Sequence, residues 1–431
     1  PARLMVFTGL GPKSSTYSHE VLRRAAGSAA RALVGNTGAT FALPTRDLAG
    51  VNAVAEGAAL GAYVFNDFRG SSKESHKSAL KSATIFSKLA GKSEAKEITN
   101  RASIIAKYTH LVRDLINTPP SHLTPDSFTK KLAASFKAAG GLKAGLKITI
   151  WDEKQLKSQG FGGIIGVGQG SANPPRLLHI SYTPKAKNVK RFAFVGKGIT
   201  FDTGGLNLKP GFGMEAMKCD MSGAAAVCAA TLAIAELALP VAIECWAPLA
   251  ENMPSDTATR PSDVITIFGG KTVEVLNPDA EGRLVLADAM MKAQSSKNKL
   301  DGMIDVATLT GAQVVALGTR TGAVMTNNQS FSDSFIAIAK ETGEQFWPMP
   351  LPVELRASLD SPVADIANRG DASGGMMVAG LFLKEFVSDD LPWLHLDIAG
   401  PAFNEGKPHG YTPVGGTGVS MRSLVRLVEQ A

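Results

Sequence analysis

Cysteine is scarce in this sequence, and its placement excludes a scaffold held together by disulfides. The chain has 3 Cys among 431 residues, Cys219, Cys228 and Cys245, and no two of them form a CxxC pair. Disulfide-rich secreted domains and zinc knuckles need more cysteines at closer spacing. We therefore expect three buried free thiols in a reducing compartment.

Several catalytic signatures are also missing. The 7 His are scattered without an HExxH pair, which disfavours a zinc protease site held by imidazoles, and no GxSxG elbow is present. Gly270-Lys271-Thr272 imitates the end of a phosphate loop, but Ile265 stands where that loop needs its first glycine. The glycine-rich run 163–170 departs from the dinucleotide fingerprint at Ser171. Nucleotide-binding and serine-hydrolase classes therefore lack their signatures.

Long hydrophobic runs are absent as well. The longest uncharged stretch near the middle, Met221–Ala235, stops at Glu236 and is shorter than the roughly 18–20 residues that a bilayer requires. Residues 1–11 predict a strand that runs into a turn, without the charged and apolar regions of a signal peptide. No initiator Met is present, so we expect a processed or trimmed chain. We predict no membrane association and a cytoplasmic location.

What is present is enough apolar residues for a large core. The chain is 44% hydrophobic and 19% charged, so it lacks the low hydrophobicity and high net charge of disordered proteins. Its length corresponds to about two or three domains at roughly 100–200 residues each. The composition therefore indicates a folded protein of more than one domain.

The positive charge is concentrated in the first quarter of the chain. Residues 1–118 contain 16 Lys and Arg against 8 Asp and Glu, whereas the remainder has 29 against 30. Much of this excess comes from Lys73, Lys77, Lys81, Lys88, Lys92 and Lys96. A solvated surface explains the lysines, and a polyanion-binding patch is the alternative. Few aromatic residues lie among them, so stacking on nucleic-acid bases is not supported.

Apolar spacing divides the chain into two units joined by a helix. Residues 1–95 mix Gly, Ala and short apolar runs and predict a small α/β domain, and residues 96–118 form a linking helix with helical spacing over 98–116. Pro119-Pro120 ends this helix, because proline cannot continue it. Thr124 and Pro125 then match the N-cap and first position of another helix. We predict that residues 119–431 form the second, larger domain.

Strands and helices alternate in the larger domain. We predict strands at 146–151, 177–182, 191–195, 241–249, 303–309 and 393–398, helices at 222–237, 284–294 and 378–386, and a hairpin through Gly269-Gly270. Such alternation is typical of an α/β fold with a mixed, mostly parallel sheet sandwiched by helices.

Polar side chains lie at the ends of two apolar segments of this domain. Lys197 and Asp202 come at the end of a buried-type strand and lead into Gly204-Gly205 and Lys209. In open α/β sheets, ligands bind beyond the carboxyl ends of strands. The alternative makes Asp202 a turn residue and both lysines surface charges. Asp220 precedes an Ala-rich helix, so helix capping is its alternative role.

A third segment, Asn277–Leu284, places Asp279, Glu281 and Arg283 at alternate positions. In an extended segment these side chains share one face. Two carboxylates so close together repel each other unless a cation lies between them, and a solvated turn is the alternative. Together with Asp202 and Asp220 they supply four carboxylates, enough to hold two divalent ions about 3.5–4 Å apart.

The three segments resemble the metal and catalytic motifs of the leucyl (cytosol) aminopeptidase family. The resemblance rests on Lys197-Gly-Ile-Thr-Phe-Asp202-Thr-Gly-Gly, Met217-Lys-Cys-Asp220-Met-Ser-Gly-Ala-Ala and Asn277-Pro-Asp279-Ala-Glu281-Gly-Arg283-Leu, the last being the family's signature octapeptide. Further similarity brings its coverage to about residues 100–431. The N-terminal 95 residues match loosely and are shorter than the domain that members usually carry, so we expect part of that domain to be missing.

The resemblance implies a two-metal mechanism. One ion would be held by Asp202, Asp279 and Glu281, and the other by Lys197, Asp202, Asp220 and Glu281. A bridging hydroxide would attack the peptide carbonyl, Lys209 would stabilise the oxyanion, and Arg283 would hold a bicarbonate that acts as general base. The residues implied to line the substrate site are Lys209, Met217, Asp220, Thr308, Leu309 and Gly311.

The resemblance also implies partners and cofactors. The substrates would be peptides with a free N-terminus and an apolar first residue, preferably Leu, and the assembly a homohexamer built as a dimer of trimers. Oxygen-rich ligands admit Zn²⁺, Mn²⁺, Co²⁺ or Mg²⁺. The competing hypothesis from another class is a nucleic-acid-binding protein that uses the basic first quarter.

Overall fold

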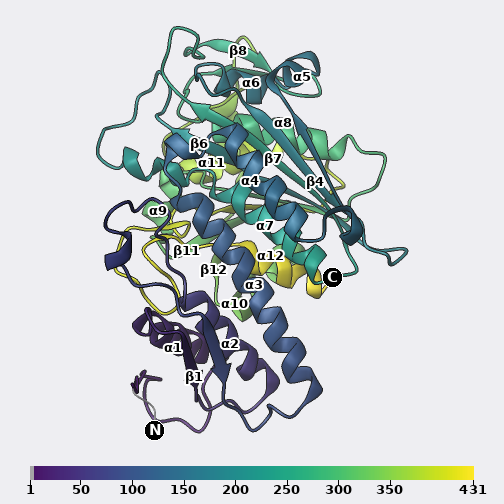
Figure 1. Cartoon of the computed structure of the whole chain (residues 1–431). Coiled ribbons are helices and arrows are strands. Elements are labelled where there is room, and N and C mark those ends of the chain that lie inside the picture. The colour runs from purple at the N-terminus through teal and green to yellow at the C-terminus, as the bar shows by residue number, and fades with distance from the viewer. Residues whose placement is uncertain (1–3) are drawn as a thin grey trace.

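The computed structural model describes residues 4–431, and its N-terminal part is a small α/β unit (Figure 1). This unit contains α1 (His19–Ala32), β1 (Gly38–Phe41), α2 (Leu48–Gly61) and β2 (Ser82–Ile85), followed in the chain by α3 (Ser93–Asn117). The two strands pair in parallel, and apolar side chains of both α1 and α2 form a core with Phe41. The α/β character predicted for this region is confirmed.

The strand predicted over residues 1–11 is wrong in the part that the structure describes. Residues 4–10 form neither helix nor strand, and residues 1–3 lie outside the described part. Leu4, Met5 and Phe7 are exposed, with Phe7 88% exposed. A strand needs a neighbouring strand for its backbone hydrogen bonds, and no described strand pairs with this segment.

The long helix α3 runs from the N-terminal unit to the larger one (Figure 1). It is the helix predicted over residues 98–116, extended at both ends. Its buried residues include Ile105, Tyr108 and Val112, which join a core shared with the larger unit. Thr118 ends the helix in an extended conformation, as expected for a chain about to enter Pro119-Pro120.

A nine-stranded sheet forms the centre of the larger unit. Its strands are β3 (Leu146–Trp151), β4 (Arg176–Tyr182), β5 (Arg191–Gly196), β6 (Gly198–Asp202), β7 (Ala242–Asn252), β10 (Gly302–Ala307), β11 (Thr321–Thr326), β12 (Gln345–Pro348) and β14 (Trp393–Asp397). The order is β12-β11-β14-β10-β5-β7-β4-β3, and β6 also pairs with β7. The pairs β11–β14, β7–β4 and β4–β3 are antiparallel and the others parallel. The predicted mixed, mostly parallel sheet is confirmed.

Helices cover both faces of this sheet and make two apolar cores. One core contains residues of α3, α4, α7, α10 and α12, and the other contains residues of α6, α8 and α11. The bounds are α4 (Pro125–Ala138), α5 (Glu153–Ser158), α6 (Gly162–Gly168), α7 (Ser222–Glu236), α8 (Gly282–Gln294), α9 (Gly311–Leu317), α10 (Gln329–Thr342), α11 (Gly375–Lys384) and α12 (Met421–Glu429). Thr124 caps α4, as predicted, by accepting a hydrogen bond from the Ser127 backbone amide.

The Ala-rich helix α7 lies against the sheet. By length and composition, the stretch Met214–Glu236 is the one described helix apolar enough to cross a membrane, but 94% of its most apolar window is buried inside the protein. A Cβ atom at Gly223 would lie 1.9 Å from the Val306 carbonyl oxygen of β10, so only glycine permits this close approach. These contacts are those of a core helix.

Smaller elements complete the unit. β8 (Asp263–Thr266) and β9 (Thr272–Val275) form the predicted hairpin through Gly269-Gly270, and β13 (Ile366–Ala367) adds a third strand in parallel with β9. Both glycines have positive φ angles, which the hairpin turn requires. The remaining elements are β15 (Phe403–Asn404), β16 (Gly415–Gly416) and the 3₁₀ turns η1 (Lys73–Ser75), η2 (Pro120–His122), η3 (Gly141–Ala144), η4 (Met214–Cys219) and η5 (Val353–Leu359).

Candidate metal centre

Two neighbouring strand ends bring the first polar residues of the site together. Lys197 lies between β5 and β6, and its backbone amide donates to the Val306 carbonyl at 2.9 Å. Asp202 is the last residue of β6 and is followed by Gly204, whose positive φ angle turns the chain away from the sheet. The Gly204 amide donates to Asp202 Oδ1 at 2.9 Å, so Asp202 also has the turn contact considered as its alternative role.

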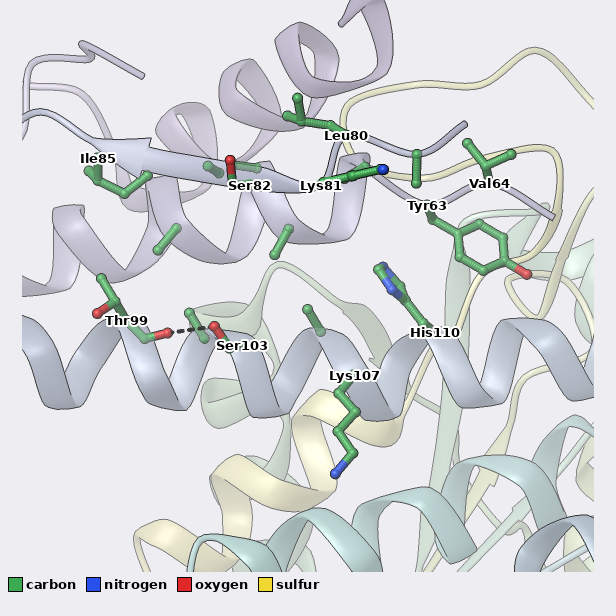
Figure 2. A pocket seen from close by; sticks show the side chains of 18 of the residues that line it. Tyr63, Val64, Leu80, Lys81, Ser82, Ile85, Thr99, Ser103, Lys107 and His110 are labelled. Atoms are coloured by element: carbon green, nitrogen blue, oxygen red, sulfur yellow. Dashed lines mark hydrogen bonds between the residues drawn. The ribbon is translucent and has the colours of Figure 1, made fainter. Parts of the chain in front are cut away.

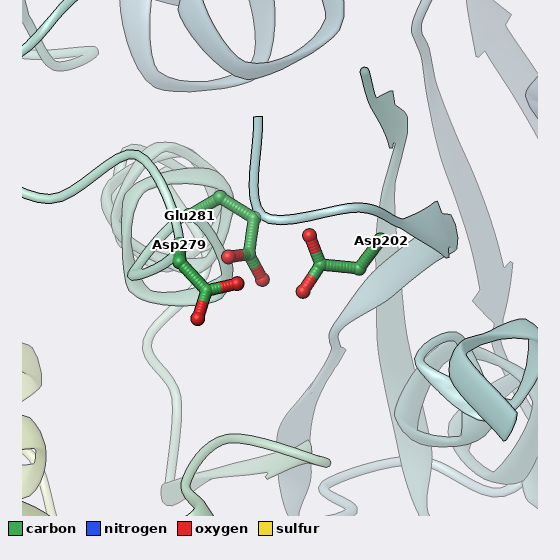
Figure 3. Close-up of side chains that lie close together, drawn as sticks. All are labelled: Asp202, Asp279 and Glu281. Atoms are coloured by element: carbon green, nitrogen blue, oxygen red, sulfur yellow. The ribbon is translucent and has the colours of Figure 1, made fainter. Parts of the chain in front are cut away.

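Three carboxylates converge from two segments, Asp202 from the end of β6 and both Asp279 and Glu281 from the turn before α8 (Figure 3). One oxygen each of Asp202, Asp279 and Glu281 lie within 4.8 Å of one another. Asp202 and Glu281 are each 2% exposed, and Asp279 is half-buried. Carboxylates repel one another at such distances unless positive charge lies between them, so this cluster has the donor set and spacing of a divalent-cation site.

The extended conformation predicted for the third segment is wrong. The chain makes a turn in which the Ala280 amide donates to the Asn277 carbonyl at 3.0 Å, and Glu281 takes a helical conformation at the N-cap of α8. Asp279 and Glu281 nevertheless point to the same place. Arg283 lies within α8, where its Nη1 donates to the Asn368 carbonyl at 2.8 Å. The three side chains therefore do not share the single strand face that was expected.

Two lysines supply positive charge to the carboxylates. Lys197 Nζ lies 2.9 Å from Asp220 Oδ1 and 2.9 Å from Glu281 Oε1, and it donates to the Thr308 carbonyl at 2.9 Å. Lys209 Nζ lies 2.9 Å from Asp202 Oδ2 and also contacts Asp279. Lys197 is 3% exposed. The surface-charge alternative is therefore wrong for Lys197, and Lys209 also belongs to the cluster.

Asp220 lies beside the cluster, paired with Lys197, and does not cap the helix that follows it. Met221 is the N-cap of α7 and makes no side-chain capping bond. Asp220 Oδ1 instead accepts a hydrogen bond from Thr308 Oγ1 at 2.7 Å. Among residues 4–431, Asp220 Oδ2 and Glu281 Oε2 are buried without a hydrogen-bond partner. Because a buried carboxylate oxygen without a partner is costly, these oxygens fit the role of cation ligands.

Burial and like charge shift the pKa values of the four acids. Burial raises the pKa of Asp220 well above its usual value, with Lys197 opposing and Glu281 and Asp202 reinforcing the shift. Burial also raises the pKa of Asp202 and Asp279. The pKa of Glu281 is lowered, because the charges of its lysine neighbours outweigh the effect of burial. A divalent cation in the cluster would favour the ionised form of all four.

The residues expected to line the substrate site surround this cluster unevenly. Thr308 is buried and contacts both Asp220 and Lys197. Leu309 is half-buried after β10, and its amide donates to Asp397 Oδ1 at 3.1 Å. Met217 is half-buried in η4, and Gly311 is exposed at the start of α9. The structure thus brings Thr308 into the cluster, and the apolar pocket remains a prediction.

Two asparagines of the site were missed by the sequence analysis. Asn252, the last residue of β7, donates through Nδ2 to Asp202 Oδ1 at 2.8 Å and to the Pro278 carbonyl at 3.1 Å. Its place at the carboxyl end of an apolar strand is the signal that identified Asp202 and could have found it. Asn368 also contacts the loop that carries Asp279, but it follows a two-residue strand and has no such signal.

A prominent cavity lies elsewhere, between α2, β2 and α3 (Figure 2). It has a volume of about 500 Å³, its wall is rich in alanine, and Tyr63 and His110 lie at one end. None of the predicted site residues lines it. This cavity therefore lies apart from the carboxylate cluster.

Comparisons with known proteins cover the whole chain. The catalytic domain of the cytosol aminopeptidase family matches residues 110–425, and the N-terminal domain of that family matches residues 1–72. The similarity therefore extends well before residue 100, where the motifs first showed it.

The relatives and solved structures agree with the family match. A probable cytosol aminopeptidase of Streptomyces griseus is 52% identical over 100% of this chain and 84% of its own length, and one of Streptomyces coelicolor is 51% identical over 100% and 85%. The structure of the bottromycin maturation enzyme BotP in complex with Mn has a TM-score of 0.89 at 37% identity, covering 98% of this chain and 90% of that one.

These matches and the cluster decide between the two function classes. The family and the relatives are aminopeptidases, and the nucleic-acid alternative finds no support in them. The six lysines from Lys73 to Lys96 are exposed, as expected if they form a solvated surface. The chain belongs to the cytosol aminopeptidase family, and it is a metal-dependent aminopeptidase that acts on peptides.

Proposed function

We propose that this aminopeptidase uses two divalent cations to remove apolar first residues, preferably Leu, from peptides with a free N-terminus. Asp202, Asp279 and Glu281 would hold one cation, and Lys197, Asp202, Asp220 and Glu281 the other. The observation that carries the proposal is the convergence of three carboxylates within 4.8 Å beside buried carboxylate oxygens that have no partner in the described part of the chain.

The two cations, when bound, would lower the pKa of a shared water and polarise the peptide carbonyl. Lys197 can bind a cation only as a neutral amine. Burial favours this form, but without a cation the charges of Asp220 and Glu281 outweigh burial and raise the pKa of Lys197. Neighbouring dications would reverse this preference. The substrate's α-amine would complete the coordination, which explains a requirement for a free N-terminus.

The remaining charged groups fit roles in stabilising the reaction. Lys209 is partly exposed beside Asp202 and Asp279. Burial would lower its pKa, but the charges of these acids outweigh burial and raise the pKa, so Lys209 is an ammonium. It would stabilise the oxyanion. Burial lowers the pKa of Arg283 to about 10, so it stays charged at neutral pH. Its Nε is buried without a partner in residues 4–431, which suits a bound bicarbonate acting as general base.

Substrate selection would depend on the segments flanking the cluster. Met217 of η4 and the Thr308–Gly311 segment after β10 would line the pocket for the first side chain. Thr308 contacts both Asp220 and Lys197, so a change in the proposed pocket wall would also move the proposed cation ligands.

We further propose Zn²⁺ or Mn²⁺ as the working ions, with Co²⁺ and Mg²⁺ as substitutes. The BotP structure named above contains Mn, which supports Mn²⁺. A homohexamer built as a dimer of trimers and a cytoplasmic location are likewise proposals, and the names of the relatives support the latter.

Metal reconstitution tests the proposed function. Metal-free protein should not cleave a Leu anilide, and Mn²⁺ or Zn²⁺ should restore cleavage. Asp279→Ala and Glu281→Ala should each lower activity by at least ~100-fold with the fold retained, since even outer-shell changes cost roughly 10–100-fold. Asp390→Ala, at an exposed position, is the control. Full activity in both ligand variants would refute the ligand assignment.

A further inference from the structure

One asparagine after β13 extends the ladder between two strands. β13 pairs in parallel with β9, with Ile366 opposite Val273 and Ala367 opposite Glu274. The next backbone amide, that of Asn368, donates to the Glu274 carbonyl at 2.9 Å. β9 ends at Val275, and beyond it the chain makes the turn that carries the cluster's acids.

The Asn368 side chain forms the next hydrogen bonds, with the residues that follow the end of β9. Its Oδ1 accepts hydrogen bonds from the Leu276 and Asn277 amides at 2.8 and 3.1 Å. Its Nδ2 donates to the Asn277 and Ala280 carbonyls at 2.7 and 3.3 Å. The side chain is fully buried, at 0% exposure. It therefore binds the chain on both sides of Asp279.

The same residue also holds the start of α8. The Asn368 carbonyl accepts the hydrogen bond from Arg283 Nη1 at 2.8 Å. The segment from Leu276 to Arg283, which contains two proposed cation ligands and the proposed anion-binding arginine, is thus fastened to one residue at its beginning, middle and end.

We propose that Asn368 is a positioning residue that sets the directions of Asp279, Glu281 and Arg283. The proposal rests on the function proposed above. Only an amide offers two acceptor sites and two donors in this geometry. Aspartate would turn a carboxylate toward the Asn277 and Ala280 carbonyls. Alanine would remove the partners that the Asn368 side chain supplies to the Leu276 and Asn277 amides and to the Ala280 carbonyl, whereas the Asn277 carbonyl would keep its bond from the Ala280 amide.

Two measurements on metal-free protein test this proposal with Asn368→Ala and Asn368→Asp. Mn²⁺ binding by titration calorimetry should weaken by about 10–100-fold, as is usual when groups that orient ligands are removed. Amide hydrogen exchange within 276–283 should become faster than in the unchanged protein. The control is Asn327→Ala, because the Asn327 side chain also binds the backbone of a segment distant in the sequence, donating to the Leu391 carbonyl and accepting from the Trp393 amide, both at 2.9 Å.

The control variant should keep the Mn²⁺ affinity and the exchange rates of 276–283 found in the unchanged protein. Unchanged exchange in both Asn368 variants, or an equal loss of Mn²⁺ affinity in Asn327→Ala, would overturn the positioning role. A chain that binds no Mn²⁺ before any substitution would contradict the proposed function instead. The exchange rates would still decide whether Asn368 holds the loop.

Discussion

Gly282 lies in the segment Asn277–Leu284 and packs against Lys197, and substituting Gly282 tests this packing. It is the first residue of α8, and a Cβ atom there would lie 2.5 Å from Lys197 Cε and 2.7 Å from its Nζ. Such distances are shorter than any real Cβ contact. In Gly282→Ala the Lys197 side chain must therefore move, and its amine must leave the positions 2.9 Å from Asp220 and Glu281.

The expected magnitudes follow from these contacts. Overpacking costs about 1–3 kcal/mol, and alanine in a helix recovers roughly 0.5–1 kcal/mol relative to glycine. The free energy of unfolding should fall by about 1 kcal/mol, because Lys197 is flexible and yields. The Mn²⁺ affinity should fall more clearly, by roughly 10–100-fold, because a ligand is displaced.

Urea unfolding without metal and Mn²⁺ calorimetry would measure the two effects. The matched control is Gly375→Ala at the first residue of α11, where the nearest atom to a new Cβ is Ala312 Cβ at 3.8 Å. That variant should keep its Mn²⁺ affinity and lose no stability. Equal Mn²⁺ affinity in the two variants would refute the packing of Lys197 on Gly282.

Two further predictions concern charge. Lys209→Met should lower kcat by about 10²–10³-fold, as is found when one oxyanion donor is lost. Mn²⁺ should bind at least as tightly, because the ammonium that contacts Asp202 and Asp279 is gone. Weaker Mn²⁺ binding with an unchanged kcat would contradict this role of Lys209. Buried Glu56 pairs with Arg23 at 3.0 Å and Arg101 at 2.6 Å, and these charges outweigh burial and lower its pKa to about 2. Since this pKa is lower in the folded than in the unfolded chain, Glu56 contributes up to about 3 kcal/mol above pH 5, lost as the pH falls toward 2. In Glu56→Gln the unfolding free energy should depend less on pH over this range, and parallel curves for the two proteins would exclude the contribution.

Local sequence signals predicted the parts of the fold that depend on neighbours in the chain. The strand over 146–151 and the capping of α4 by Thr124 follow from apolar alternation and from side-chain capping, and both are found where expected. The segment from Asp279 to Arg283 was misread as extended. Alternating charges look the same in a strand and in a turn that enters a helix, and the Asn277 turn decides between them.

The missed site residues act across long distances in the sequence. Asn368 bonds to a loop some 90 residues earlier, and nothing in its surroundings identifies that partner. Asn252 reaches Asp202 because β6 and β7 pair, and this pairing depends on the order of strands in the sheet. Asp202, Asp220, Asp279 and Glu281 could be predicted because their motifs are local in the sequence and do not depend on the order of strands in the sheet.

The arrangement proposed for Asp202, Asp220, Asp279 and Glu281, together with Lys197, encloses two cations. Anomalous diffraction at the manganese edge, from crystals grown with Mn²⁺, tests it most directly. Two peaks about 3.5–4 Å apart are expected, with Asp202 and Glu281 beside both. A single peak, or peaks away from these carboxylates, would contradict it.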